Sequence, residues 1–90
     1  MGVIRLAGRL TCLPEDAASV RRALDEHIRL SRAEPGCLSF DVTETAPCEF
    51  TVVERFVDRA AFDAHQTRTR ASDWWRVTSH MPRSFEVVEE

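Results

Sequence analysis

The sequence contains no lysine, so all 12 of its basic residues are arginine, and 15 acidic residues give the 90-residue chain a net charge of −3. The arginines are scattered and form no basic run. A protein that binds nucleic acid through electrostatics carries a basic patch or stripe, and a polybasic segment is needed to hold a protein on an anionic membrane surface. The charge balance therefore argues against both classes.

Long apolar runs are also missing. No stretch approaches the roughly 20 residues of a membrane-spanning helix, and the N-terminus lacks the charged and apolar segments of a signal peptide. The three cysteines, Cys12, Cys37 and Cys48, are an odd number without CxxC spacing. We therefore expect free thiols in a cytoplasmic protein. The three histidines and three cysteines show no ligand spacing, so we predict no metal site.

What is present is a regular series of strand and helix patterns. Alternating apolar residues predict strands over residues 3–12, 37–45, 50–57 and 84–88. Apolar residues at three- and four-residue steps predict a helix that begins near Pro14 and ends before Gly36. Shorter helices are expected over residues 58–67 and 72–80, with a polar break at residues 67–70.

The order of these elements is β-α-β-β-α-α-β. It predicts one α+β domain over residues 1–90 with a ferredoxin-like fold, in which a four-stranded antiparallel sheet carries helices on one face. The other face of the sheet still bears apolar residues, among them Ala7, Val53 and Val57. Since a short chain has a modest core, a second copy is the expected cover, and we predict a homodimer. Gly8 lies on the apolar face of its strand and indicates a bulge or a close backbone approach.

The chain is organised around residues 50–65, where a β-branched and aromatic strand ends at Asp58 and a short helix follows. Asp58 is a good N-cap for that helix. Phe62 and His65 are three residues apart and face one side of it. His65 is a candidate general base or hydrogen-bond donor for a phenolic substrate. The alternative is a helix-end histidine that stabilises the negative end of the helix dipole.

Other polar and aromatic residues allow two interpretations each. Glu54 interrupts an apolar strand face and needs a partner if it is buried, either an arginine (Arg9, Arg55 or one from the partner chain) or His65. The pair Trp74 and Trp75 either packs in the core and dimer interface or forms an aromatic wall for a flat ring. His27 lies on the core stripe of the first helix, and we expect it to be half-buried and hydrogen-bonded.

Two sequence stretches and the order of elements resemble the antibiotic biosynthesis monooxygenase family of dimeric α+β barrels. The first stretch, residues 31–40 (SRAEPGCLSF), is similar to the family's helix-to-strand turn, and the second, residues 53–65 (VERFVDRAAFDAH), to its strand-to-helix turn. The resemblance covers the whole chain through the order of its elements. The heme-degrading branch of the family is disfavoured, because its characteristic positions correspond to Gly8, His65 and Trp75.

The resemblance implies a pocket between sheet and helices and a cofactor-independent monooxygenase that oxidises a quinol or anthrone-like aromatic with O2. His65 is then the catalytic residue. The residues expected to bind the small aromatic substrate are Phe40, Glu54, Phe62, Trp74 and Trp75. The alternative is a non-catalytic dimer of the same fold that binds a small molecule or serves a stress response.

Overall fold

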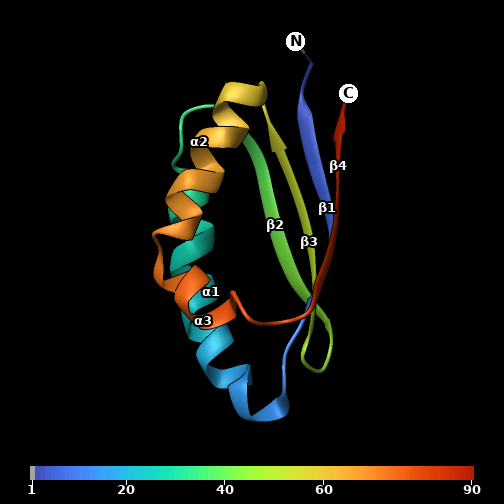
Figure 1. The fold of residues 1–90 in the computed structure, drawn as a ribbon, viewed down its shortest axis with the longest axis vertical. Coiled ribbons are helices and arrows are strands. Elements are labelled where there is room, and N and C mark those ends of the chain that lie inside the picture. The colour runs from blue at the N-terminus through green and yellow to red at the C-terminus, as the bar shows by residue number, and fades with distance from the viewer. Residues whose placement is uncertain (1) are drawn as a thin grey trace.

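The computed structural model describes residues 2–90. Four strands form one antiparallel sheet in the order β2-β3-β1-β4 (Figure 1). They are β1 (Ile4–Thr11), β2 (Cys37–Ala46), β3 (Glu49–Phe56) and β4 (Arg83–Glu89). The helices are α1 (Ala17–Arg32), which follows a 3-10 turn η1 (Pro14–Asp16), α2 (Arg59–Arg70) and α3 (Asp73–Thr78).

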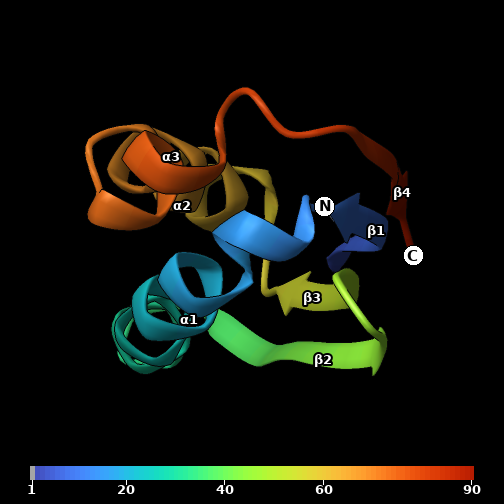
Figure 2. The ribbon, with the colours of Figure 1, turned by 90° about the horizontal axis from the view of Figure 1, so that it is seen from below.

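All three α-helices lie on one side of the sheet (Figures 1 and 2). The predicted α+β, ferredoxin-like arrangement is therefore confirmed. In Figure 2 the helices lie nearest to β2 and β3, and the segment between α3 and β4 runs across to the far edge of the sheet. Within residues 2–90 no helix is both long and apolar enough to cross a membrane.

The core lies between the sheet and the helices and consists of two clusters. They form because the alternating residues of each strand put every second side chain on the helix-facing side. The first cluster contains Ile4, Leu6, Phe40, Val52, Phe56 and Phe62. The second contains Leu10, Val20, Leu24, Phe50, Trp74 and Met81.

Helix α2 is longer than the sequence predicted. Residues 67–70 were expected to break it, but the helix continues to Arg70. The segment contains no glycine or proline, so nothing in it forces an end. Its side chains also make tertiary contacts, since Arg68 Nη2 donates to Ser31 Oγ at 2.9 Å. Packing against α1 therefore outweighs the weak helix propensity of the threonines.

One apolar residue of β2 does not face the core as its spacing suggested. Leu38 is 51% exposed. Cys37 is paired with Phe56 and Ser39 with Arg55, so the register shifts between them and Leu38 is the extra residue of a β-bulge. A bulge interrupts the alternation of sides along a strand. The alternating pattern over residues 37–45 predicts that Leu38 faces the core together with Phe40, and for Leu38 this is wrong.

The thiols of Cys12, Cys37 and Cys48 are free. Cys12 and Cys48 lie close together, because the Cys12 N–H donates to the Cys48 carbonyl at 2.9 Å. Burial and the neighbouring Cys48 thiol raise the pKa of Cys12 to about 11. The cytoplasmic location that the cysteines suggested stays a prediction.

Gly8 allows β4 to approach β1 closely. It is paired with Phe85 on one side and Val52 on the other, and the pairing continues through it without a register shift. A Cβ atom at this position would lie 2.0 Å from the Ser84 carbonyl oxygen and 2.8 Å from the Phe85 Cα. Of the two predicted roles of Gly8, the close approach is therefore correct and the bulge is wrong.

We expect Gly8→Ala to lower the free energy of unfolding by about 1–3 kcal/mol, because β4 must move away to admit the methyl group. Urea denaturation measures this change. Ala60→Ser, on the exposed first turn of α2, is the control and should change stability by less than about 0.5 kcal/mol. Equal stability of Gly8→Ala and the wild-type protein would contradict the close packing of β1 against β4.

Candidate functional site

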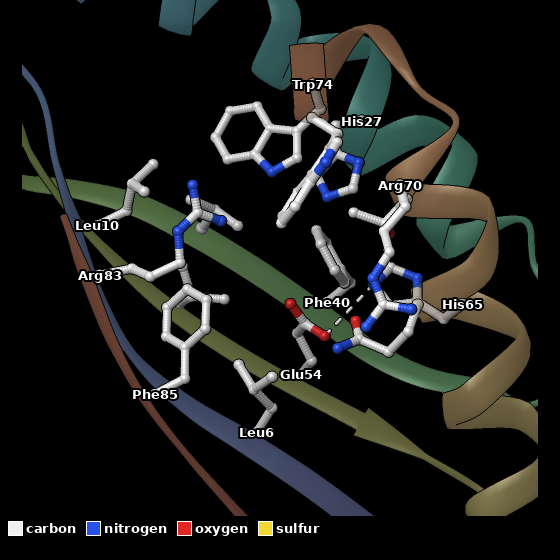
Figure 3. Close-up of a pocket in the computed structure, with 15 residues that line it drawn as sticks. Leu6, Leu10, His27, Phe40, Glu54, His65, Arg70, Trp74, Arg83 and Phe85 are labelled. Carbon is white, nitrogen blue, oxygen red and sulfur yellow. Dashed lines mark hydrogen bonds and ion pairs between the residues drawn. The ribbon is translucent and has the colours of Figure 1, made fainter. Parts of the chain in front are cut away.

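A cavity of about 170 Å³ lies between the sheet and the helices. Figure 3 shows side chains from the sheet and from all three α-helices pointing toward it. Eight of the fifteen lining residues are apolar, and the other seven carry polar or charged groups. The cavity is lined by Leu6, Leu10, His27, Phe40, Val42, Val52, Glu54, His65, Gln66, Thr69, Arg70, Trp74, Trp75, Arg83 and Phe85.

His65 reaches this cavity from the middle of α2, which runs from Arg59 to Arg70. The helix begins as predicted, because the Asp58 side chain accepts the Ala61 N–H at 2.9 Å. Only 2% of His65 is exposed, and its ring packs against Phe56 with 4.8 Å between centroids. The alternative of a helix-end histidine that stabilises the dipole is therefore wrong, since the residue is buried and lies well inside the helix.

The Glu34 carboxylate orients the His65 ring. His65 Nδ1 lies 2.7 Å from Glu34 Oε1, and the other oxygen of Glu34 is paired with the Arg68 guanidinium. Glu34 follows α1, where Gly36 turns the chain with a φ of +86°. A carboxylate can only accept a hydrogen bond, so it assigns the proton of neutral His65 to Nδ1. Nε2 is then left with a lone pair.

That second ring nitrogen lies beside polar groups of the cavity. His65 Nε2 is 3.3 Å from Thr69 Oγ1 and 3.5 Å from Glu54 Oε1 (Figure 3). Burial lowers the pKa of His65, while Glu34 opposes the shift and Arg68 adds to it. His65 is therefore neutral at pH 7, which is the form that can accept a proton.

Glu54 is a buried carboxyl without an arginine partner among residues 2–90. It is 6% exposed, and its Oε1 makes no hydrogen bond within the described structure. Burial, and to a lesser extent Glu34, raises its pKa to about 8. The predicted salt bridge to Arg9 or Arg55 is wrong. Both arginines project from the other side of the sheet, where Arg9 pairs with Glu49 and Arg55 with Glu90.

His27 is more buried than predicted and is not fully hydrogen-bonded. It is 4% exposed, and its Nδ1 has no partner among the described residues. The ring stacks on Trp74 with a centroid separation of 4.9 Å and an interplanar angle of 4°. Burial, followed by the nearby His65 and Arg68, lowers the pKa of His27 to about 3. His27 is therefore a neutral aromatic part of the wall.

The structure brings together most of the predicted site residues and leaves one out. Phe40, Trp74 and Trp75 line the cavity together with Glu54 and His65. Phe62 does not line it, because its ring packs edge-on against Phe56 in the first core cluster.

Sequence reasoning missed Glu34, Arg70 and Arg83. A signal existed for Glu34, because a negative charge just beyond a helix C-terminus is electrostatically unfavourable and needs another explanation. Arg70 and Arg83 had no such signal. Within residues 2–90 no group of three or more histidine, cysteine or acidic side chains is arranged to hold a metal ion.

Comparison with known proteins points to one family. Residues 3–77 match the model of the family described as antibiotic biosynthesis monooxygenase. Rv0793 of Mycobacterium tuberculosis, provisionally named a monooxygenase, is 34% identical over 64 residues. That match spans 70% of this chain and 63% of Rv0793. The aligned part is therefore less than two thirds of the length of Rv0793.

Solved structures share the fold. That of Rv0793 superposes with a TM-score of 0.79 over 98% of this chain and 94% of Rv0793, at 27% identity. A Nitrosomonas europaea protein, provisionally named an antibiotic biosynthesis monooxygenase, gives a TM-score of 0.84 over 100% of this chain and 92% of its own, at 19% identity. At that identity the likeness shows the fold alone.

We expect Glu54→Gln to stabilise the protein at high pH. The pKa of Glu54 is raised from 4.5 to about 8, so the folded state holds a proton that the unfolded state releases. The contribution of protonated Glu54 to the free energy of unfolding is complete below pH 4.5 and is lost as the pH rises through 8. The variant should therefore be more stable than the wild type by roughly 2–5 kcal/mol at pH 9, and about equal at pH 4.5.

Chemical denaturation at both pH values measures the difference. Glu26→Gln, on the exposed face of α1, is the matched control and should show no such dependence. A stability difference between Glu54→Gln and the wild type that does not change with pH would show that Glu54 is ionised in the folded protein.

Proposed function

The chain belongs to the antibiotic biosynthesis monooxygenase family, and from this we propose that it is a cofactor-independent monooxygenase that oxidises a quinol or anthrone-like phenol with O2. The observation that carries the proposal is the Glu34–His65 pair, with Nδ1 held at 2.7 Å and Nε2 at the wall of an apolar cavity. A neutral imidazole so oriented can take a proton from a phenol.

In the proposed first step, His65 Nε2 accepts the proton of a substrate hydroxyl. The Glu34 carboxylate stabilises the imidazolium that forms, because it accepts the Nδ1–H at 2.7 Å. Glu54, which burial keeps protonated below a pKa of about 8, can donate a hydrogen bond to the developing phenolate. The burial of His65 and Glu54 strengthens both interactions, since little water competes with them.

In the second step, a ring carbon of the phenolate, next to the carbon that bears the oxygen, attacks O2, and a carbon–oxygen bond forms. The C–H bond at that carbon and the O–O bond of the resulting hydroperoxide then break together, which leaves one oxygen atom as a carbonyl group and releases the other as water. All four electrons that reduce O2 come from the substrate, so hydroquinone and O2 give hydroxybenzoquinone and water. The proton held by His65 completes the water.

The size of the cavity favours a single-ring substrate over a three-ring anthrone. Its volume is about 170 Å³, and an apolar cavity of about 150 Å³ is enough to hold benzene. The ring walls of Phe40 and Trp74 suit a flat aromatic molecule. A single-ring quinol is therefore the first substrate to test.

We expect His65→Gln to reduce oxygen consumption with hydroquinone by about 10²–10⁴-fold, the usual range for loss of a general base. Glu34→Gln should shift the acid side of the pH–rate profile to lower pH, because Glu34 raises the pKa of His65. An oxygen electrode measures both. His80→Gln, which changes an exposed histidine, is the control and should be as active as the wild type.

Thermal melting separates loss of chemistry from loss of folding. A folded His65→Gln variant with unchanged turnover would remove His65 from the mechanism. Binding of quinols without oxygen uptake by the wild type would instead favour the non-catalytic binding protein over the enzyme.

We also propose a homodimer in which two sheets pack face to face. The side of the sheet opposite the helices is uncovered by residues 2–90 (Figure 1). At its centre Val53 lies between Ala7 on β1 and Asp41 on β2. Val57, just beyond β3, is 46% exposed. These apolar groups support the proposal, because a second copy would remove them from water.

We expect Val53→Glu to break the dimer, because it would bury an unpaired charge at the centre of the interface, which costs several kcal/mol. Light scattering at micromolar concentration measures the mass. Ala60→Glu, on the exposed first turn of α2, is the control and should leave the dimer intact. A wild-type protein that is monomeric under these conditions would contradict the proposal.

A further inference from the structure

Arg83 is held at the cavity by contacts within the chain. It is the first residue of β4 and is half-buried. Its guanidinium carbon lies 5.1 Å from the centre of the Trp75 ring. Its Nε donates to the Met81 carbonyl at 3.4 Å, and its Nη2 donates to the Thr78 carbonyl. These contacts fix the guanidinium beside the cavity.

The Arg83 cation has no counter-ion in the part of the chain that the structure describes. No acidic side chain among residues 2–90 lies within ion-pair distance of Arg83, and burial alone lowers its pKa. A guanidinium has five N–H donors, and only two of the Arg83 donors are engaged. Its Nη1 donors and the remaining Nη2 donor are therefore available to a bound anion, which would also supply the missing charge.

A second arginine adds to the positive charge of the cavity wall. Arg70, at the last position of α2, lines the cavity and has no hydrogen bond or ion pair with any described residue. The one acidic residue of the wall is Glu54, whose pKa of about 8 leaves it mostly neutral at pH 7. Arg70 and Arg83 are thus two cations in a cavity wall whose one acidic residue is mostly neutral.

The two ends of the cavity differ in their chemistry. Figure 3 shows Arg83 on the opposite side of the cavity from His65, with Glu54 between them. The cavity has a volume of about 170 Å³, and Leu6, Phe40 and Phe85 give part of its wall an apolar surface. One aromatic ring fits there, with a hydroxyl group toward His65 and an anionic group toward Arg83. A planar guanidinium matches the two oxygens of a carboxylate in particular.

We propose that the substrate is a single-ring hydroxylated aromatic carboxylate, whose carboxylate binds to Arg83, while Arg70, which Figure 3 shows on the His65 side, adds to the positive charge of the wall. The inference rests on the proposed oxygenase site, because His65 defines the end at which the hydroxyl group binds. It narrows the substrate class from phenols in general to those that carry an acid group.

The test compares two ligands that differ only in the carboxylate. Isothermal titration without oxygen measures the affinity for 2,5-dihydroxybenzoate and for hydroquinone. We expect the wild type to bind the acid roughly 10- to 100-fold more tightly, the range that one charge-assisted hydrogen bond provides. In Arg83→Gln this ratio should fall close to one, and in Arg70→Gln it should fall by a smaller factor.

Arg76→Gln is the matched control, because Arg76 pairs with Asp73 on the outside of α3 and does not line the cavity. It should keep the wild-type ratio. Arg83 also binds two carbonyl groups next to β4, so Arg83→Gln is checked by thermal melting. If Arg83→Gln does not fold, Arg83→Lys is tested instead, because it keeps the positive charge but not the planar fork of the guanidinium. An affinity ratio of acid to hydroquinone equal to that of the wild type would then overturn the role of the fork.

Equal or weaker wild-type binding of the acid would overturn the proposal. The two proposals fail in different ways. Preference for the acid without oxygen uptake would keep the anion site and overturn the oxygenase. Oxygen uptake with both ligands, and no preference in binding, would keep the oxygenase and overturn the anion site.

Discussion

The hydrogen bond between Glu34 and His65 is the interaction on which the rest of the site depends. It joins the turn between α1 and β2 to the middle of α2, and Arg68 reinforces it from the next turn of the same helix. It therefore positions α2 over the sheet and also selects the tautomer of His65. The same hydrogen bond, from His65 Nδ1 to Glu34 Oε1, holds α2 in place and determines the tautomer of His65. A change that breaks this bond therefore affects both the packing of α2 and the chemistry of His65.

Burial determines the charges inside the cavity. Glu54 and His27 are both almost fully buried, and burial is the largest cause of the raised pKa of one and the lowered pKa of the other. The interior is therefore neutral, although it contains a carboxyl group and imidazoles. The charge of the cavity wall remains on Arg83 and Arg70. A wall that is cationic at Arg83 and neutral at Glu54 and His27 suits a flat molecule that is apolar in the middle and acidic at one end.

Part of the site could be predicted from the sequence because it follows from local patterns. His65 and Glu54 stand out, since each is a polar residue in an apolar pattern, and Trp74 and Trp75 are too large to be left exposed. Arg83 could not be found in this way, because it lies at the start of a strand, where polar residues are ordinary. Glu34 left only one sign, its unfavourable negative charge just beyond the C-terminus of α1. The resemblance to the family predicted Phe62 as a pocket residue, but the packing of α2 directs it to the core instead.

The sequence by itself determined the order of the elements, the sheet with helices on one face and the start of α2 at Asp58, because periodicity and capping depend on residues that are close along the chain. Tertiary structure decided that α2 continues to Arg70, that Leu38 lies on a bulge and that Glu34 is the partner of His65. These features depend on contacts between residues about 30 positions apart or on different strands. These contacts contribute free energy only when the chain is folded, so the local sequence pattern does not predict them.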